Sequence, residues 1–250
     1  AQTIWTLGST IGAQSATATA AGLSGSPVSF TATAASAWTL DATIFTNASF
    51  GGAKGSLADV TVLKLNDGRY RMIIGASPGI SGMRSAISTD GINFTLESGV
   101  RVAQCSQGIP CFGHPFVMRL DDGRARLFVN VSRSAEGFEG GIYSFTSSDD
   151  GMTFTRDAGV RVTAAAAGIN GISGPTIVKL TSGGWRMYFS DNPFTGHPSD
   201  RVAPKKIVSA VSTDLVTWTM DPGIRIGAGS TLTGSAAHPG SIVNADGSIT

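Results

Sequence analysis

Three side chains that could do chemistry occupy the same position in successive copies of one repeated segment. They are Asp59, His114 and His238, and the remaining copy has Gly174 there. A carboxylate and an imidazole can act as general base and general acid, and both can hydrogen-bond a polar ligand. Two histidines and an aspartate around one opening could also hold a metal ion. No short ligand motif of the HExxH type accompanies them, so the sequence predicts neither a metal nor another cofactor.

The segment that carries these residues is a predicted β-hairpin. Each full copy has an apolar run, a turn and an alternating run, and the turns are Asn66-Asp67-Gly68, Asp121-Asp122-Gly123 and Thr181-Ser182-Gly183. A second hairpin follows each copy, with a turn around Asp90, Asp150 or Asp214 and then an aromatic residue, which is Phe94, Phe154 or Trp218. Four antiparallel strands repeated at about 60 residues are typical of the blades of a β-propeller.

The two ends of the chain supply the parts of one further blade. Residues 29–32 and 38–41 match the third and fourth strands of a blade, and residues 238–247 match a first strand and its turn. We therefore expect an all-β, single-domain propeller of four blades, closed by pairing of the N- and C-terminal strands. The expected blades are 1–50 with 238–250, 56–104, 112–164 and 173–228. The alternative is a five-bladed propeller that is incomplete at its C-terminal end.

Recurrence separates structural charges from chemical ones, because a fold repeats its parts whereas a site is built once. Ten of the 17 carboxylates recur at one blade position, either in a turn or just after the aromatic residue. Two sets of arginines also recur, each at one blade position, and we call each set an arginine column. We expect these arginines to pair with those carboxylates between blades. The columns are Arg71, Arg126 and Arg186, and Arg101, Arg161 and Arg225.

The charged residues that do not recur fall mostly on one predicted face of the propeller. The first strands begin at this face, and the loops after the second strands return to it, among them residues 132–141 and 192–206. The irregular segment 8–26 belongs there too, and such loops commonly carry function. The unmatched residues assigned to this face are Asp59, Glu136, Glu139, Asp191, Asp200, His114, His197 and His238, whereas Asp121 and Asp149 lie in turns on the opposite face.

Composition excludes several classes of function. Charged residues make up 14% of the chain, the formal net charge is +1, and no long basic run occurs, so electrostatic capture of nucleic acid or of a membrane surface is not expected. No apolar stretch approaches the roughly 20 residues that cross a bilayer. Cys105 and Cys111 could close a short disulfide loop, and the chain starts without Met as a processed secretory protein does. We therefore expect a secreted or extracellular protein.

The second-hairpin turns resemble those of known glycan-processing propellers. The sequence Ser147-Ser148-Asp149-Asp150-Gly151-Met152-Thr153-Phe154 is similar to the Asp-box of sialidases, and residues 210–219 resemble the blade motif of the furanosidase-type glycoside hydrolases, the arabinanase and invertase group. Those hydrolases place catalytic carboxylates near the starts of inner strands. Of the corresponding residues here, only Asp59 is a carboxylate.

The resemblance implies a carbohydrate-interacting propeller and leaves catalysis open. If the protein is a glycoside hydrolase, Asp59 is the base or nucleophile and a loop carboxylic acid, Glu136 or Asp191, protonates the leaving oxygen. The substrate-binding candidates are then His114, His238, His197 and Asp200. The alternative is a non-catalytic extracellular structural or adhesion module, favoured by the missing carboxylates at the other strand starts.

Overall fold

A computed structural model describes residues 12–19, 26–34, 59–75, 82–103, 112–131, 139–191, 205–227 and 236–250, together with residues 21, 24 and 45. The ordered elements in these ranges are all β-strands, as predicted. In the described part of the chain, no helix has the length and apolar character needed to cross a membrane. The chain divides into two compact units, Ala1–Thr43 and Ile44–Thr250, which are described separately.

The first unit contains one hairpin. Strand β1 (Gly12–Ala18) pairs antiparallel with β2 (Val28–Ala34), which contains the predicted strand 29–32. The prediction that residues 8–26 are irregular was wrong for β1. Its residues are mostly small and do not alternate between apolar and polar, so the strand gives no period-two signal. The other predicted strand, residues 38–41, lies outside the described residues.

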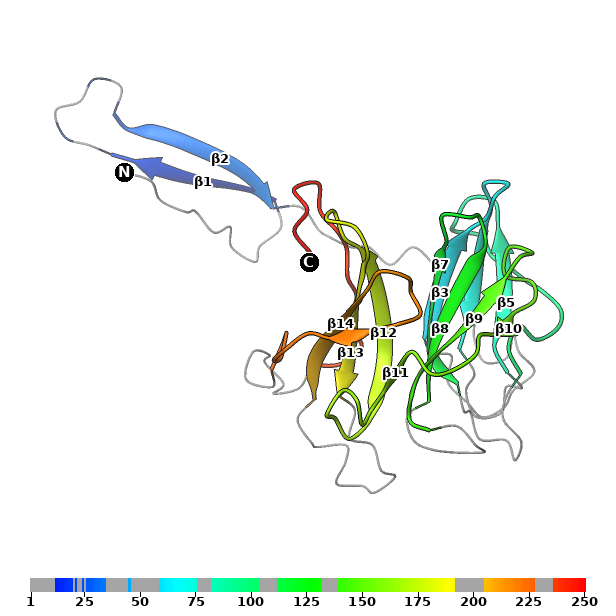
Figure 1. The fold of residues 1–250 in the computed structure, drawn as a ribbon. Coiled ribbons are helices and arrows are strands. Elements are labelled where there is room, and N and C mark those ends of the chain that lie inside the picture. The colour runs from blue at the N-terminus through cyan, green and yellow to red at the C-terminus, as the bar shows by residue number, and fades with distance from the viewer. Residues whose placement is uncertain are drawn as a thin grey trace. The chain divides into compact units, whose positions relative to one another are not determined.

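The second unit contains three antiparallel sheets that correspond to the three complete predicted blades (Figure 1). The first is β3 (Val60–Lys64), β4 (Tyr70–Ile74), β5 (Arg84–Ser88) and β6 (Thr95–Leu96). The second is β7 (Gly113–Arg119), β8 (Ala125–Val131), β9 (Gly141–Ser147) and β10 (Thr155–Arg156), with β11 (Val162–Thr163) also on β9. The third is β12 (Ile172–Lys179), β13 (Trp185–Asp191), β14 (Lys206–Ser212) and β15 (Thr219–Met220).

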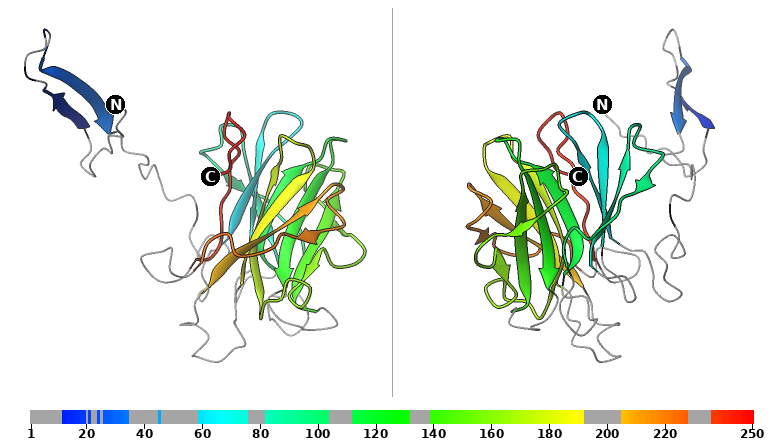
Figure 2. Two further views of the ribbon diagram at one scale, coloured as in Figure 1. Left: turned by 60° about the vertical axis from the view of Figure 1, so that its left-hand side comes forward. Right: turned by 90° about the vertical axis from the view of Figure 1, so that its right-hand side faces the viewer.

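The first strand of each sheet is its innermost strand, and β7 contacts both β3 and β12 (Figure 2). This is the arrangement of adjacent propeller blades, which confirms the predicted fold class. At the C-terminal end, a turn at Gly247 brings Val243 into a single antiparallel bridge with Ile249. The four-bladed closure by the two ends of the chain stays a prediction.

The core lies between the sheets. Leu127 and Val129 of β8 pack in a cluster with Leu63 and Ile73 of the first sheet, whereas Phe128 packs with residues of the third sheet. All three β8 side chains are fully buried. The middle sheet is therefore buried on both faces, and the centre of its second strand, residues 127–129, is a continuous apolar run rather than an alternating one.

The predicted turn residues bond their own backbone. In the first turns, Asp67, Asp122 and Asp246 each accept the N–H two residues further on, at 2.9–3.0 Å. In the second turns, Asp90 and Asp214 accept backbone N–H groups two and three residues further on. These local bonds explain why aspartate recurs in the turns.

In the second turn of the middle sheet, the residue equivalent to Asp90 of the first sheet is Asp149. The prediction that Asp150 is the equivalent residue was wrong. Ser147 Oγ bonds Asp149 as Ser88 Oγ bonds Asp90, and this turn is one residue longer than its counterparts. Asp150 is the unmatched residue. It pairs with Arg119 at 2.7 Å and accepts a bond from Asn66 of the first sheet, which links two blades.

The first arginine column pairs within a blade, so the predicted pairing between blades was wrong. Each arginine lies on the second strand and meets a carboxylate that follows the fourth strand of the same sheet. The serine of the intervening strand donates to that carboxylate, at 2.6–2.7 Å. The three sets are Arg71–Glu97 with Ser85, Arg126–Asp157 with Ser144, and Arg186–Asp221 with Ser209.

The second arginine column does connect blades, but through backbone carbonyls. Arg101 donates to Met152 O at 2.6 Å, and Arg161 donates to Val216 O at 3.4 Å. Both acceptors lie in the second turn of the next sheet. Charges that recur at one blade position therefore stabilise the fold, as the sequence analysis predicted for them.

Candidate functional site

The four equivalent residues Asp59, His114, Gly174 and His238 share an unusual backbone conformation. Their φ angles are 58°, 44°, 61° and 51°, which lie in the left-handed region. Aspartate and histidine tolerate this region better than most residues, and glycine has no side chain to oppose it. The repeat thus conserves a backbone shape at the start of each inner strand while its side chain changes.

A break in the strand pairing accompanies this conformation. The register of β7 with β8 shifts between Gly113 and Phe116, and that of β12 with β13 shifts between Ser173 and Thr176. Such a bulge turns a side chain away from the direction that the pleat would give it. A proline follows three of the four residues and lacks the N–H that would continue the ladder.

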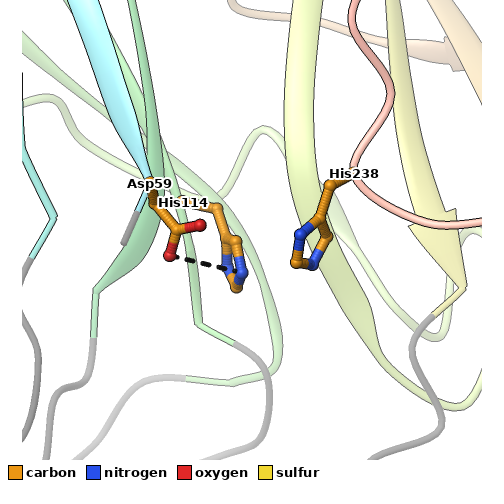
Figure 3. A group of neighbouring side chains, drawn as sticks. All are labelled: Asp59, His114 and His238. Carbon is orange, nitrogen blue, oxygen red and sulfur yellow. Dashed lines mark ion pairs between the residues drawn. The ribbon is translucent and has the colours of Figure 1, made fainter. Parts of the chain in front are cut away.

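The left-handed turn brings Asp59, His114 and His238 together, as Figure 3 shows. Nε2 of His114 lies 3.4 Å from Oδ2 of Asp59, and the ring centroids of His114 and His238 are 4.2 Å apart. One potential ligand atom from each of the three residues lies within 4.8 Å of the others. The structure thus places these three residues close together, and their role as a site stays a prediction.

Gly174 makes room for this cluster. A Cβ at position 174 would lie 3.1 Å from Cα and 3.2 Å from Cδ2 of His238. The ring of His238 therefore occupies the space that a side chain in the third copy would need. This steric relation explains why the column contains three polar side chains and one glycine.

Three buried side chains hold the histidines in place. Nδ1 of His114 lies 2.9 Å from Oδ1 of Asn130 on β8, an acceptor. Nδ1 is therefore the donor toward Asn130, and Nε2 is the ring nitrogen that faces Asp59. Oγ of Ser173 lies 3.3 Å from Nδ1 of His114 and 3.4 Å from Nε2 of His238, while the backbone N–H of His238 donates to Oγ of Ser190 at 2.8 Å.

These residues open into a cavity of about 240 Å³. Its ionisable side chains are Asp59, His114 and His238, Thr61 and Thr176 also line it, and its apolar lining includes Phe116 and the prolines that follow the strand starts. Asp59 and His114 expose 27% and 23% of their side chains, so both are accessible to a ligand. A small concave site with an apolar lining and a few polar groups is typical of ligand binding.

The electrostatics keep His238 neutral. Partial desolvation lowers the pKa of His238, and the neighbouring imidazole of His114 lowers it further, against the opposing effect of Asp59. A neutral imidazole can both donate and accept a hydrogen bond. The cavity therefore offers a carboxylate acceptor beside an imidazole that can do either.

The arrangement of Ser173, His114 and Asp59 has the composition of a hydrolase triad but not its function. The Ser173 side chain is completely buried, and Nδ1 of His114 is closer to Asn130 than to Ser173. A serine nucleophile must reach its substrate and be deprotonated by the histidine. Ser173 therefore supports the imidazole rings and is not a nucleophile.

Asp191, the other catalytic candidate within the described residues, is not part of the cavity lining. It ends β13 at the same end of the sheet as Ser173, because it pairs with Ile172 at the start of β12. Only 9% of its side chain is exposed, Lys206 Nζ lies 3.5 Å from it, and the N–H of Asn170 donates to it. The predicted residues Glu136, His197, Asp200, Cys105 and Cys111 lie outside the described residues.

Sequence reasoning missed Asn130, Ser173 and Ser190. All three are buried, at 1%, 0% and 0% exposure. Asn130 was visible only as a polar residue inside an otherwise apolar run of β8, and that interruption was the one available signal. The serines resemble the many other small polar residues of the chain, so nothing distinguished them.

The described residues thus form propeller blades with a polar cluster where the inner strands begin. No protein-family model and no curated protein sequence matches the chain. Solved structures do match. The crystal structure of an endo-1,4-beta-xylanase from Bacteroides thetaiotaomicron is 16% identical with a TM-score of 0.62, covering 95% of this chain and 78% of that one. The endo-arabinase from the same organism is 19% identical with a TM-score of 0.59, covering 80% and 70%.

A third match has lower coverage. A thermostable family-43 glycoside hydrolase is 18% identical with a TM-score of 0.52, and the chain spans about half of it, covering 70% of this chain and 54% of that one. At these identities the likeness establishes the fold. The chain therefore has the β-propeller fold of glycoside hydrolases, as the resemblance of its turns predicted.

Proposed function

We propose that the protein binds carbohydrate in the cavity at Asp59, His114 and His238. The observation that carries this proposal is the convergence of the three side chains that the repeat does not explain, around one accessible cavity. Sugar hydroxyls both donate and accept hydrogen bonds, which suits a carboxylate beside two imidazoles. The neighbours' names, an arabinase and a xylanase, give the same substrate class.

The size of the cavity favours a short ligand. Its volume of about 240 Å³ is below the roughly 300 Å³ at which sites for drug-sized ligands begin. Phe116 and Pro115 contribute apolar surface on which the C–H face of a sugar ring could pack. We therefore propose that the cavity accepts one sugar residue, or the end of a longer chain.

The described residues favour binding over hydrolysis. Glycoside hydrolysis commonly uses two carboxyl groups about 5–9.5 Å apart across the substrate. Among the described residues that line the cavity, Asp59 is the one carboxylate, and Asp191 is buried beside Lys206. A hydrolytic role would therefore require Glu136 or Asp200, and the alternative function is a non-catalytic extracellular module.

Two linked measurements test this proposal. Glycan-array screening followed by calorimetry should identify a bound oligosaccharide, with affinity reduced at least about 10-fold in Asp59→Asn and in His238→Asn. Asparagine is chosen because it tolerates the left-handed backbone of both positions. Asp121→Asn, in an exposed ion pair with Lys179, is the matched control and should bind normally. Binding that is unchanged in both site variants would exclude this cavity.

A panel of chromogenic glycosides, assayed in parallel, decides between the two roles. Turnover that is lost in Asp59→Asn would assign hydrolysis to the cavity. Binding without turnover would assign a non-catalytic role.

We also propose an extracellular location. The support is the pair Cys105 and Cys111, which are six positions apart and suit a short disulfide loop in an oxidising compartment. Intact mass after alkylation of the protein isolated from its native source is the test. Two alkylated thiols without reduction would contradict the disulfide.

A further inference from the structure

We infer that Asp59, His114 and His238 form a binding site for one divalent transition-metal ion of the zinc type. The inference goes beyond carbohydrate binding and does not depend on it, because the three side chains would ligate the ion with or without a sugar. The reason lies in how the potential ligand atoms face one another (Figure 3).

One ring nitrogen of His114 faces the carboxylate of Asp59. Nδ1 of His114 lies 2.9 Å from Oδ1 of Asn130, so Nε2 is the ring nitrogen that faces Oδ2 of Asp59, at 3.4 Å. Two acceptors that face each other repel unless a cation lies between them. The cation is either a proton on Nε2 or a metal ion.

The distance between those atoms favours the metal. A proton shared between imidazolium and carboxylate brings N and O to about 2.7–2.9 Å. Zinc bonds of about 2.05 Å at the tetrahedral angle instead place two ligand atoms about 3.3–3.4 Å apart. The observed separation of Nε2 and Oδ2 is 3.4 Å, which matches one edge of a tetrahedral metal shell, and the ligand atoms of all three residues lie within 4.8 Å of one another.

The supporting residues match what a metal site needs. A ligating histidine commonly donates its other N–H to a buried acceptor, which is the role of Asn130 toward His114. The backbone of His238 is held by Ser190, and Gly174 leaves space for its ring. The left-handed backbone at all three ligands is the kind of local strain that clusters at functional sites.

The donor set selects the ion. Calcium and magnesium prefer oxygen ligands, and two imidazoles with one carboxylate suit zinc and its neighbours in the transition series. Three protein ligands leave a fourth position for water or another ligand, as in open zinc sites. All three ligands line the cavity, so a ligand in the cavity could reach the ion.

No short ligand motif marks this site in the sequence, because its ligands are 55 and 124 residues apart. Short metal motifs place ligands on one turn or one helix, whereas these come from three different repeats. The expectation of no metal came from linear spacing, and propeller geometry replaces that spacing with a shared position around one opening.

Calorimetry on the full chain, after treatment with a chelator, tests the inference. We expect one Zn²⁺ per chain, with affinity reduced at least about 100-fold in Asp59→Asn, His114→Asn and His238→Asn. Asp121→Asn should bind as the wild type does. Circular dichroism without metal should be the same for all variants. Zinc binding that is unchanged in the site variants, or calcium binding in preference to zinc, would overturn the inference.

A second measurement uses the wild type alone, in case a variant fails to fold. The chain has three histidines, and Zn²⁺ should shift the imidazole resonances of two of them, His114 and His238, in a ¹H–¹⁵N spectrum. Co²⁺ in their place should give the visible absorption of a tetrahedral ion with nitrogen ligands. Shifts confined to the third histidine, or none at all, would refute the site.

Discussion

The body of each blade and the start of its inner strand use charge in different ways. In the body of the blade, charged side chains recur and are matched, as when Arg71 binds both oxygens of Glu97 and Ser85 donates to the same carboxylate. At the start of the inner strands, backbone shape recurs while the side chain changes from Asp59 to His114 to Gly174. A repeat therefore conserves what the fold needs and varies what it does not. The varied positions are where a site can be built.

The largest expected effect on stability comes from the framework ion pair Arg71–Glu97. Although burial alone raises the pKa of the Glu97 carboxyl, the hydrogen bonds from Arg71 and Ser85 outweigh it and hold the pKa below its usual value. Removing Arg71 leaves this carboxylate partly buried without its counter-ion. We expect Arg71→Ala to lower the free energy of unfolding by about 3 kcal/mol or more, measured by urea denaturation.

Two controls accompany this variant. Arg124→Ala breaks an exposed ion pair with Asp122 and should change stability little. Arg71→Met combined with Glu97→Met removes both charges and should recover much of the loss, because an apolar pair of similar volume needs no counter-ion. A double variant as unstable as Arg71→Ala would show that packing rather than pairing is responsible.

The turns provide a smaller effect that depends on pH. Backbone N–H groups of Thr217 and Val216 lower the pKa of Asp214 to about 2. The pKa in the unfolded chain is about 3.9. A carboxylate whose pKa is lowered by folding stabilises the fold above the unfolded value and loses that contribution as pH falls toward the folded value.

Stability should therefore fall between about pH 4 and pH 2, and part of this fall belongs to Asp214. In Asp214→Asn, the difference between urea midpoints at pH 5 and pH 2.5 should be smaller than in the wild type. Asp121→Asn controls for the loss of one negative charge. An unchanged difference in Asp214→Asn would mean that its turn contributes nothing to acid stability.

The same contrast explains what could be read from the sequence. The hairpins were predictable because turn chemistry is local, and Asp67 bonds the backbone two residues away. Asp150 was confused with Asp149 because one turn has an extra residue, which only its bonds to Ser147 reveal. At the site, Asp59, His114 and His238 were found by comparing repeats. Asn130 was not, because its role depends on a contact between neighbouring strands that no local pattern encodes.

The smallest expected effect gives the strictest test of the comparison. Asp59→Asn and Glu97→Gln make the same chemical change, from a carboxylate to its amide, in the two regions. Asp59 faces His114 at 3.4 Å, longer than a charge-assisted hydrogen bond, and 27% of its side chain is exposed, whereas Glu97 accepts close bonds from Arg71 and Ser85. In the presence of a chelator, Asp59→Asn should change the free energy of unfolding by no more than about 0.5 kcal/mol, and Glu97→Gln should cost clearly more. If Asp59→Asn costs as much as Glu97→Gln, the strand-start charges belong to the framework, and the variation among the repeats does not mark a site.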